Sequence, residues 1–264
     1  MDALYDQIGS GYDATRKPDP YIRDKLKALL RPVEGERYVD VACGTGNYTL
    51  SLAKAGVRIV GFDASARMIA TARKKGRPSS HEGFVLADVG QTPFKSAAFD
   101  GAVCTLAIHH FPDLMAAFCE IGRLVHPVSG RLVLLTALPL QMKRYWLCRY
   151  FPTMLRRSWE QMPDMEKLVK ALYVAGFPHI DTEPYEVTET LEDLFLYSGK
   201  HRPQLYLDAG FRAGISSFAN LADAGEVAHG LDQLAKDIKS GAICDIIRSY
   251  SHKGGDYLFI RADR

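Results

Sequence analysis

The stretch that decides the fold of this chain is residues 38–47, Tyr-Val-Asp-Val-Ala-Cys-Gly-Thr-Gly-Asn. Its first four residues form a short apolar run that predicts a buried strand. The next part, residues 43–46, is a turn of small residues, which let a ligand approach the backbone closely. A helical pattern then runs from Thr49 to Lys54. Strand, glycine turn and helix in this order predict a nucleotide site above the carboxyl end of the first strand of a doubly wound α/β sheet.

The turn departs from the dinucleotide-binding pattern G-x-G-x-x-G, because the third glycine position is occupied by Thr49. An acid, Asp40, also stands ahead of the turn, and Asp63 ends the next apolar run. A carboxylate ahead of the turn faces a pyrophosphate poorly and suits an ammonium group, bound directly or through water. These features argue against a nicotinamide-dependent oxidoreductase, which is the alternative from another enzyme class.

With these residues the chain resembles the class I S-adenosylmethionine-dependent methyltransferases. Their first motif, acid-x-Gly-x-Gly-x-Gly, is matched by residues 40–46 with Ala42 in place of the first glycine. We expect the extra methyl group to crowd the turn slightly. The resemblance implies S-adenosylmethionine as the cofactor and S-adenosylhomocysteine as the product.

Four more apolar runs support this resemblance, since they follow at matching spacing and predict strands two to five: residues 57–63, 83–89, 99–104 and 130–135. Asp63 is expected to accept hydrogen bonds from both ribose hydroxyls. The resemblance further implies that Asp88 and the Val89 amide read the adenine edge, and Met68 suits the adenine face. The remaining residues of the expected cofactor site are Tyr12, Arg16, Asp40, Ala42, Gly44, Gly46, Asn47, Ala64, Thr105 and Leu106.

The segment after the fourth run, residues 105–113, resembles the methyltransferase type 11 subgroup, which includes quinone C-methyltransferases. This resemblance extends to the N-terminal residues, where a tyrosine and an arginine of the subgroup close over the cofactor. Tyr12 and Arg16 match them, and Tyr5 is the next candidate, here expected to bind substrate. The alternative is an ordinary amphipathic segment that packs on the sheet edge.

The expected fold is therefore a doubly wound, seven-stranded, Rossmann-like methyltransferase sheet with an inserted, mostly helical cap. Residues 1–35 form the N-terminal cap segment, and residues 36–137, 164–187 and 255–264 form the cofactor-binding core. The substrate cap comprises two insertions, residues 138–163 and 188–254. Residues 220–250 are expected to form two amphipathic helices, with the first broken at residues 224–225.

The cap insertions are rich in aromatic and basic residues, a composition typical of small-molecule pockets. Trp146, Tyr197, His201 and Arg202 are the expected substrate-binding residues of the cap. The last two lie in the run 198–203, which is expected to bind a carboxylate or phosphate or to be a solvated turn. For any single aromatic residue, a place in the cap's own core is the alternative.

Two adjacent histidines, His109 and His110, are the best-placed titratable pair, and we expect a general base among them. The alternative is that one ring packs beside the cofactor while the other anchors the loop. The chain has five cysteines in no C-x-x-C pair, and Cys43 and Cys104, at strand ends near the expected cofactor, are interpreted as small buried hydrophobic residues. A thiol metalloid site would need Cys43, Cys104 and Cys148 to converge, and no metal site is expected.

Composition narrows the possible functions. The chain has 264 residues and a net charge of +2, which gives no electrostatic case for nucleic acid. No apolar run reaches the ~20 residues of a membrane span, and the polar N-terminus does not match a signal peptide, so a cytoplasmic location is expected. The predicted function is methyl transfer to a small-molecule acceptor, with a non-catalytic cofactor-binding protein as the alternative. The acceptor, the methylated atom and the oligomeric state are left open.

Overall fold

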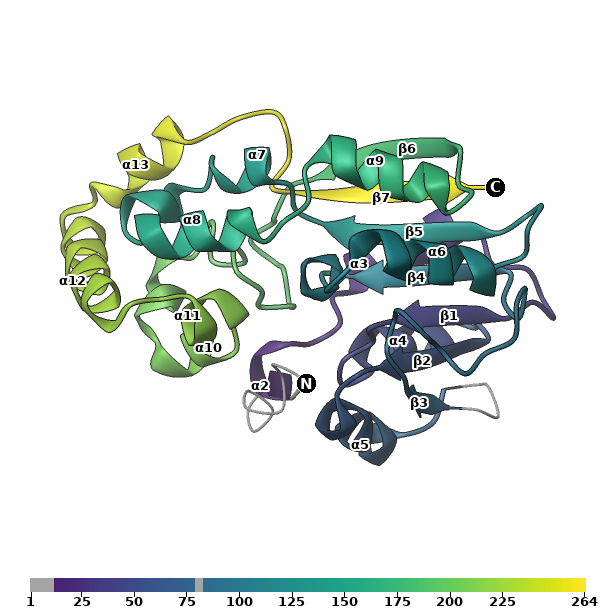
Figure 1. Cartoon of the computed structure of the whole chain (residues 1–264). Helices are drawn as coiled ribbons and strands as arrows, with labels where there is room; N and C mark the ends of the chain where they lie inside the picture. Colours follow the sequence, from purple (N-terminus) through teal and green to yellow (C-terminus); the bar gives the residue numbers. More distant parts are fainter. Residues whose placement is uncertain (1–11, 79–82) are drawn as a thin grey trace.

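The computed structural model describes residues 12–78 and 83–264 and contains a seven-stranded sheet with helices on both faces (Figure 1). The strand order is β3-β2-β1-β4-β5-β7-β6. The expected doubly wound, Rossmann-like sheet is confirmed. The strands are β1 (Tyr38–Val41), β2 (Ile59–Asp63), β3 (Phe84–Leu86), β4 (Gly101–Thr105), β5 (Arg131–Thr136), β6 (His179–Tyr185) and β7 (Tyr257–Asp263).

The strand directions place a crevice beside β1. Strands β1 to β5 pair in parallel, whereas β7 is antiparallel to both β5 and β6. The chain runs outward from β1 to β2 and β3, then returns to the other side of β1 at β4. Ligands of doubly wound sheets bind at such a reversal, beyond the carboxyl ends of the strands. The turns after β1 and β4 are therefore the places to look for a site.

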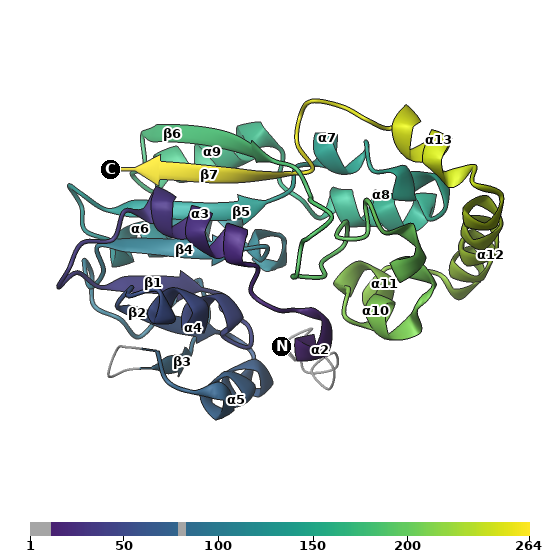
Figure 2. The same ribbon diagram turned by 180° about the vertical axis from the view of Figure 1, so that it is seen from behind.

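Helices cover the sheet because each has one apolar face. On one face lie α3 (Pro20–Leu30) and α4 (Asn47–Lys54), and on the other lie α6 (Leu114–Leu124) and α9 (Met165–Val174) (Figures 1 and 2). Helix α5 (Ala66–Lys75) packs beside β3 and β2. The side-chain carboxylate of Asp19 accepts from the Ile22 amide at the start of α3, and Asp113 caps α6 in the same way.

Short helices gather beyond the carboxyl ends of β4 and β5 (Figure 1). The two long connections pack on each other where α8 contacts α11, and within the second connection α12 contacts the 3-10 helix η3. The longest helix among the described residues is α12 (Ala224–Ser240). The short elements are α2 (Tyr12–Thr15), η1 (Ile108–His110), α7 (Pro139–Met142), η2 (Trp146–Arg149), α8 (Pro152–Glu160), η3 (Pro203–Leu207), α10 (Ala209–Ala213), α11 (Ser216–Asn220) and α13 (Ile243–Ser249). We call the part formed by residues 138–163 and 188–254 the cap; its standing as a separate unit stays a prediction.

One local prediction in the cap is wrong. Residues 224–225 begin a helix rather than break one, because the Asp223 carboxylate accepts from the amides of Gly225 and Glu226 and caps α12. A glycine in the first helical turn costs less than one in the interior, since the cap supplies the bonds that the first amides lack. Among the helices of the described residues, none is both long and apolar enough to cross a membrane.

Candidate functional site

The turn after β1 requires unusual backbone conformations. Gly44 and Gly46 have φ angles of +55° and +75°, and Ala42 adopts +53°. A Cβ at position 46 would stand 2.4 Å from the Phe84 ring, so this glycine is required by space as well as by conformation. A Cβ at position 44 would meet nothing within 4 Å. The departure at Ala42 places an alanine in the left-handed region, which costs backbone strain. The expected crowding by its methyl group stays a prediction.

Asp40 is a buried acid at the end of β1. It is 2% exposed, and its Oδ2 accepts from the Thr49 hydroxyl at 2.6 Å. Burial raises the pKa of this carboxyl to about 7; the neighbouring charge of Asp63 acts in the same direction, and the Thr49 bond opposes both. No basic side chain of the described residues forms an ion pair with Asp40. A buried carboxylate in this position favours a cationic ligand.

Asp63, at the end of β2, holds the turn. Its Oδ2 accepts from the Gly44 amide at 2.8 Å and its Oδ1 accepts from the Ser65 amide at 2.8 Å. Ser65 in turn caps α5 by accepting from the Met68 amide. This carboxylate therefore fixes the entry to α5 and the glycine turn at once.

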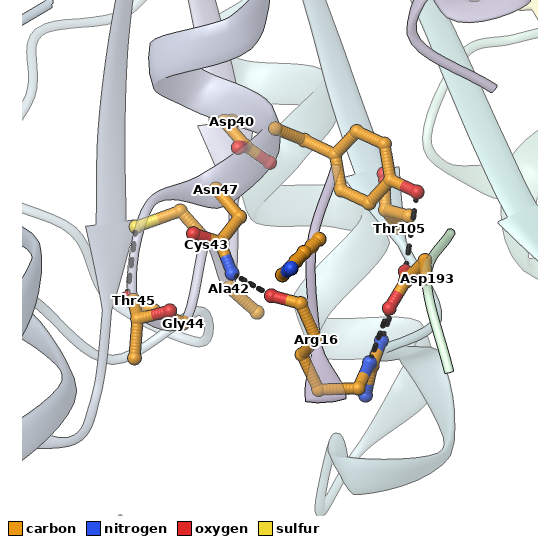
Figure 3. Close-up of a pocket in the computed structure, with 11 residues that line it drawn as sticks. Arg16, Asp40, Ala42, Cys43, Gly44, Thr45, Asn47, Thr105 and Asp193 are labelled. Carbon is orange, nitrogen blue, oxygen red and sulfur yellow. Dashed lines mark hydrogen bonds and ion pairs between the residues drawn. The ribbon is translucent and has the colours of Figure 1, made fainter. Parts of the chain in front are cut away.

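A first cavity of about 440 Å³, including its open mouth, lies over this turn (Figure 3). Its floor is the end of β1 and the turn, and Thr105 at the end of β4 forms one side. The Thr105 hydroxyl is buried and has no hydrogen-bond partner in the described part of the chain. The lining residues are Arg16, Lys17, Asp40, Ala42, Cys43, Gly44, Thr45, Asn47, Tyr48, Thr105 and Asp193.

Three of the residues that line the first cavity, Arg16, Tyr48 and Asp193, form a buried polar junction. The Arg16 guanidinium donates to both oxygens of Asp193, at 2.6 and 3.3 Å, and the Tyr48 hydroxyl donates to Asp193 at 3.1 Å (Figure 3). The Leu194 amide also donates to the Thr15 carbonyl, so backbone and side chains join the N-terminal segment to the cap. Asp193 is 1% exposed, which makes this pair costly to break.

The N-terminal segment also contacts the glycine turn itself. The Asp13 carboxylate accepts from the Thr45 hydroxyl at 2.7 Å and from the Asn47 amide at 3.2 Å. Lys75 of α5 pairs with the same carboxylate. Residues 13–16 therefore lie beside the glycine turn and the first cavity. Closure of this segment over the cofactor stays a prediction.

A second cavity of about 650 Å³ lies between the sheet and the cap. Arg16 lines both cavities, and consecutive residues of one turn divide between them, Thr105 facing the first and Leu106 the second. Leu106 has a φ angle of +54°, a strained conformation for a side chain of its size. The two cavities thus meet at this turn and at Arg16.

The two histidines follow directly in η1. Their rings are 3.8 Å apart between centroids, and only His109 lines the second cavity. Burial lowers the pKa of His109 well below its usual value, with the neighbouring His110 and the Arg16 charge adding to the effect. Burial and Arg16 also lower the pKa of His110, to about 4. Both imidazoles are therefore neutral at physiological pH.

The expected cofactor residues lie along the carboxyl edge of β1 to β4. Most line the first cavity or flank its turn, whereas Met68, Asp88 and Val89 are farther along the edge. Met68 is buried in α5, and the exposed Asp88 accepts from the Gly90 amide at 2.7 Å. Their contact with adenine stays a prediction. Tyr5 and the side chain of Tyr12 lie outside the described residues.

The expected substrate residues of the cap line neither cavity. The Trp146 indole donates to the Lys200 carbonyl, and the Tyr197 ring stacks on Tyr145 with centroids 3.9 Å apart. His201 bonds to the Val187 carbonyl, and Arg202 donates to the carbonyls of Leu191 and Ser198. These bonds tie the cap together, and a role in substrate binding stays a prediction.

Several residues that line the cavities were not predicted from the sequence. Asp193 stands in an acidic run, Glu189 to Asp193, that reads as a solvated surface, and the serines of the second cavity follow no periodic pattern. An acid flanked by apolar Leu191 and Leu194 is the one signal that pointed to burial of Asp193. Serine hydroxyls in short helices leave no comparable signal.

The cysteines do not gather into a metal or metalloid site. In the described ranges no group of three His, Cys, Asp or Glu side chains is placed to hold an ion. Cys104 is buried in β4, and the Cys148 thiol donates to the Met142 carbonyl. Burial raises the pKa of the Cys148 thiol to about 11, so this cysteine is a poor nucleophile.

Comparison with known proteins identifies the family. Residues 39–134 match the model of a methyltransferase domain. Demethylmenaquinone methyltransferase of Corynebacterium kroppenstedtii is 30% identical over 201 residues, which cover 67% of this chain and 85% of that protein. The enzyme of the same name from Chlorobaculum parvum is 31% identical over 224 residues, 74% of this chain and 89% of the relative.

A solved structure matches almost the whole chain. It is a putative methyltransferase from an antibiotic biosynthesis pathway of Anabaena variabilis, with a TM-score of 0.82 and 30% sequence identity, and the match covers 94% of this chain and 98% of that one. The strand order, the motif at residues 40–46 and these relatives agree. This chain belongs to the class I S-adenosylmethionine-dependent methyltransferases, which transfer the methyl group of that cofactor, here to a small molecule.

Proposed function

We propose that the first cavity binds S-adenosylmethionine, that the second binds the methyl acceptor, and that transfer takes place where the two meet. The observation that carries the proposal is the shared boundary: Arg16 lines both cavities, and Thr105 and Leu106 divide between them. A displacement reaction needs donor and acceptor in line and shielded from water. Two adjoining cavities that share Arg16 as a lining residue meet that need.

The residues of the first cavity fit the cofactor. The buried carboxylate of Asp40 suits its ammonium group, and the orphaned Thr105 hydroxyl offers a hydrogen bond beside it. The open space beside Gly44 lets a ligand approach the backbone. When bound, the cofactor supplies an electrophilic methyl group on a sulfonium with a good leaving group. The protein's part is to bind, to orient and to exclude water.

We place the other contacts of the cofactor by the family pattern: Asp63 with the ribose hydroxyls, and Asp88 and Val89 with the adenine. Asp63 ends β2 beside the turn, whereas Asp88 and Val89 follow β3, farther along the same edge. Arg16 is the candidate partner for the cofactor's carboxylate, and it would then exchange or share its bond to Asp193. The cytoplasmic location and the absence of a nucleic-acid or membrane partner stay predictions.

Calorimetric titration with S-adenosylmethionine and S-adenosylhomocysteine tests this proposal. We expect both to bind wild-type protein, and the Asp40→Asn variant to bind them at least about tenfold more weakly. Asp24→Asn is the matched control, because Asp24 is an exposed acid on α3 paired only with its neighbour Arg23. The absence of binding by wild-type protein at millimolar ligand contradicts the proposal, and NADH serves as the negative control.

A further inference from the structure

The second cavity has a mostly apolar lining with several hydroxyl groups. Residues of the cap supply much of its apolar part, one from helix α7 and the others from loops: Met142, Met162, Phe195, Leu196 and Ile215. Ser158 and Ser217 also line it, and their hydroxyls bond to each other at 2.7 Å. Apolar walls with a few placed polar groups bind small molecules of matching polarity. The cavity therefore suits a mostly apolar ligand that carries uncharged polar substituents.

The charges around the second cavity argue against an ionised ligand. Arg16 is the one charged side chain among the described lining residues, and Asp193 neutralises it at 2.6 Å. No described Asp or Glu lines this cavity, so an ammonium group has no counter-ion there. A carboxylate or phosphate would have to compete with Asp193 for a buried guanidinium. Burying an unpaired ion costs several kcal/mol, roughly, and an uncharged acceptor avoids that cost.

His109 is the titratable side chain of the second cavity that is able to take a proton. No hydrogen bond joins either ring nitrogen to a residue in the ranges 12–78 and 83–264, and the Nδ1 atom is buried. The groups that face the ring are His110, at 3.8 Å between centroids, and the cation Arg16. Both disfavour a charged imidazole, so His109 is held in its neutral form, which has a ring nitrogen that can accept a proton.

We propose that the second cavity binds an uncharged phenol or enol, and that His109 removes the proton of its hydroxyl as the methyl group is transferred. This inference rests on the proposed function and adds to it the chemical class of the acceptor and the role of one residue.

The step balances in atoms and charge. The O–H bond of the acceptor breaks, and its proton moves to a ring nitrogen of His109. The electron pair of the resulting phenolate or enolate, on oxygen or on the conjugated carbon, forms the bond to the methyl carbon. The methyl–sulfur bond breaks with its electrons on sulfur, which leaves a neutral thioether and an imidazolium that later releases its proton to water.

Binding of three matched naphthalenes tests the acceptor class. The probes are 1-naphthol, 1-naphthoic acid and 1-(aminomethyl)naphthalene, which share one ring system and differ in charge. Each is titrated by calorimetry into protein saturated with S-adenosylhomocysteine. We expect 1-naphthol to bind at least about tenfold more tightly than either ion. Tighter binding of an ion, or equal or absent binding of all three, overturns the proposal.

The His109→Gln variant tests the role of the base. We expect a fall in kcat of about 10²-fold or more with 1-naphthol, while cofactor affinity and melting temperature stay unchanged. The variant relies on acceptor that is already ionised, so its rate should rise about tenfold per pH unit between pH 7 and pH 9, below the ordinary phenol pKa of about 10. Wild-type protein should show a much weaker dependence.

His229→Gln is the matched control, because His229 is an exposed histidine on α12, outside both cavities. It should keep the wild-type rate and pH profile. An O-methyl or C-methyl product supports the proposal. A His109→Gln variant with the wild-type rate and pH profile overturns it. Failure of wild-type protein to bind S-adenosylmethionine would instead contradict the proposed function, which the calorimetry measures separately.

Discussion

Cofactor affinity should depend on pH through Asp40. This carboxyl has a pKa of about 7 in the protein without ligand, because it is buried. The ammonium group of the cofactor binds the carboxylate form of Asp40, so at lower pH Asp40 must first lose its proton before the cofactor binds. The apparent dissociation constant should therefore rise about twofold at pH 7 and about elevenfold at pH 6, relative to pH 8 or above, which corresponds to roughly 1.4 kcal/mol per pH unit below the pKa.

The assay is calorimetric titration with S-adenosylhomocysteine from pH 5.5 to pH 7.5. An ordinary α-amino group loses its proton only near pH 7.7–8.0, roughly, so the ligand's ammonium stays largely charged across this range. His110, with a pKa of about 4, remains neutral there. The Asp40→Asn variant should bind weakly with no dependence on pH. Unchanged wild-type affinity between pH 6 and pH 7.5, or the same slope in the variant, would refute this reasoning.

The raised pKa of Asp40 also predicts that its contribution to folding stability changes with pH in the direction opposite to cofactor affinity. The pKa of Asp40 is raised from 3.8 to about 7 on folding, so the stabilising form is the neutral acid. The contribution of Asp40 to stability without ligand is fully present below about pH 4 and is lost as pH rises to about 7, and it is about 2.7 kcal/mol smaller at pH 8 than at pH 5. Asp40→Asn should therefore raise the free energy of unfolding most at pH 8, in a pH-dependent denaturant titration.

Three further substitutions have defined outcomes. Ala42→Gly should stabilise the protein by about 1 kcal/mol in thermal unfolding, because it relieves a left-handed alanine; an unchanged or lower melting temperature would count against that strain. Gly46→Ala should destabilise by about 1–3 kcal/mol and reduce cofactor binding, since its Cβ would clash with Phe84; wild-type stability and affinity would contradict the clash. Asp193→Asn should raise the KM for cofactor and acceptor together, because Arg16 lines both cavities; an effect on one KM alone would show that the cavities are not coupled through this pair.

The strands and strand-end acids around the expected cofactor site could be predicted from the sequence. Buried strands leave continuous apolar runs, and an acid at the end of such a run, as at Asp40 and Asp63, stands out against them. Parallel strands bring those ends to one edge, so order along the chain predicted proximity in space. Arg16 followed from the family pattern, and it lies at the junction of the two cavities.

The residues that line the second cavity could not be predicted from the sequence, for a physical reason. Aromatic residues in a cap look the same in sequence whether they line a cavity or fill the cap's core. Trp146 and Tyr197 belong to the core of the cap, where the Trp146 indole is hydrogen-bonded and the Tyr197 ring is stacked. The second cavity is instead lined by residues such as Ser217 and Ile215 from short helices and loops, where no periodicity marks the inner face. The capping of α12 by Asp223 was missed because glycine near a helix start reads as a break.

A crystal structure with bound S-adenosylhomocysteine tests the central claim most directly. The account predicts that its ammonium group lies against Asp40 and that its sulfur points across Thr105 and Leu106 into the second cavity, toward His109. A ligand bound in the first cavity with its sulfur directed away from the second, or bound elsewhere on the protein, would contradict it.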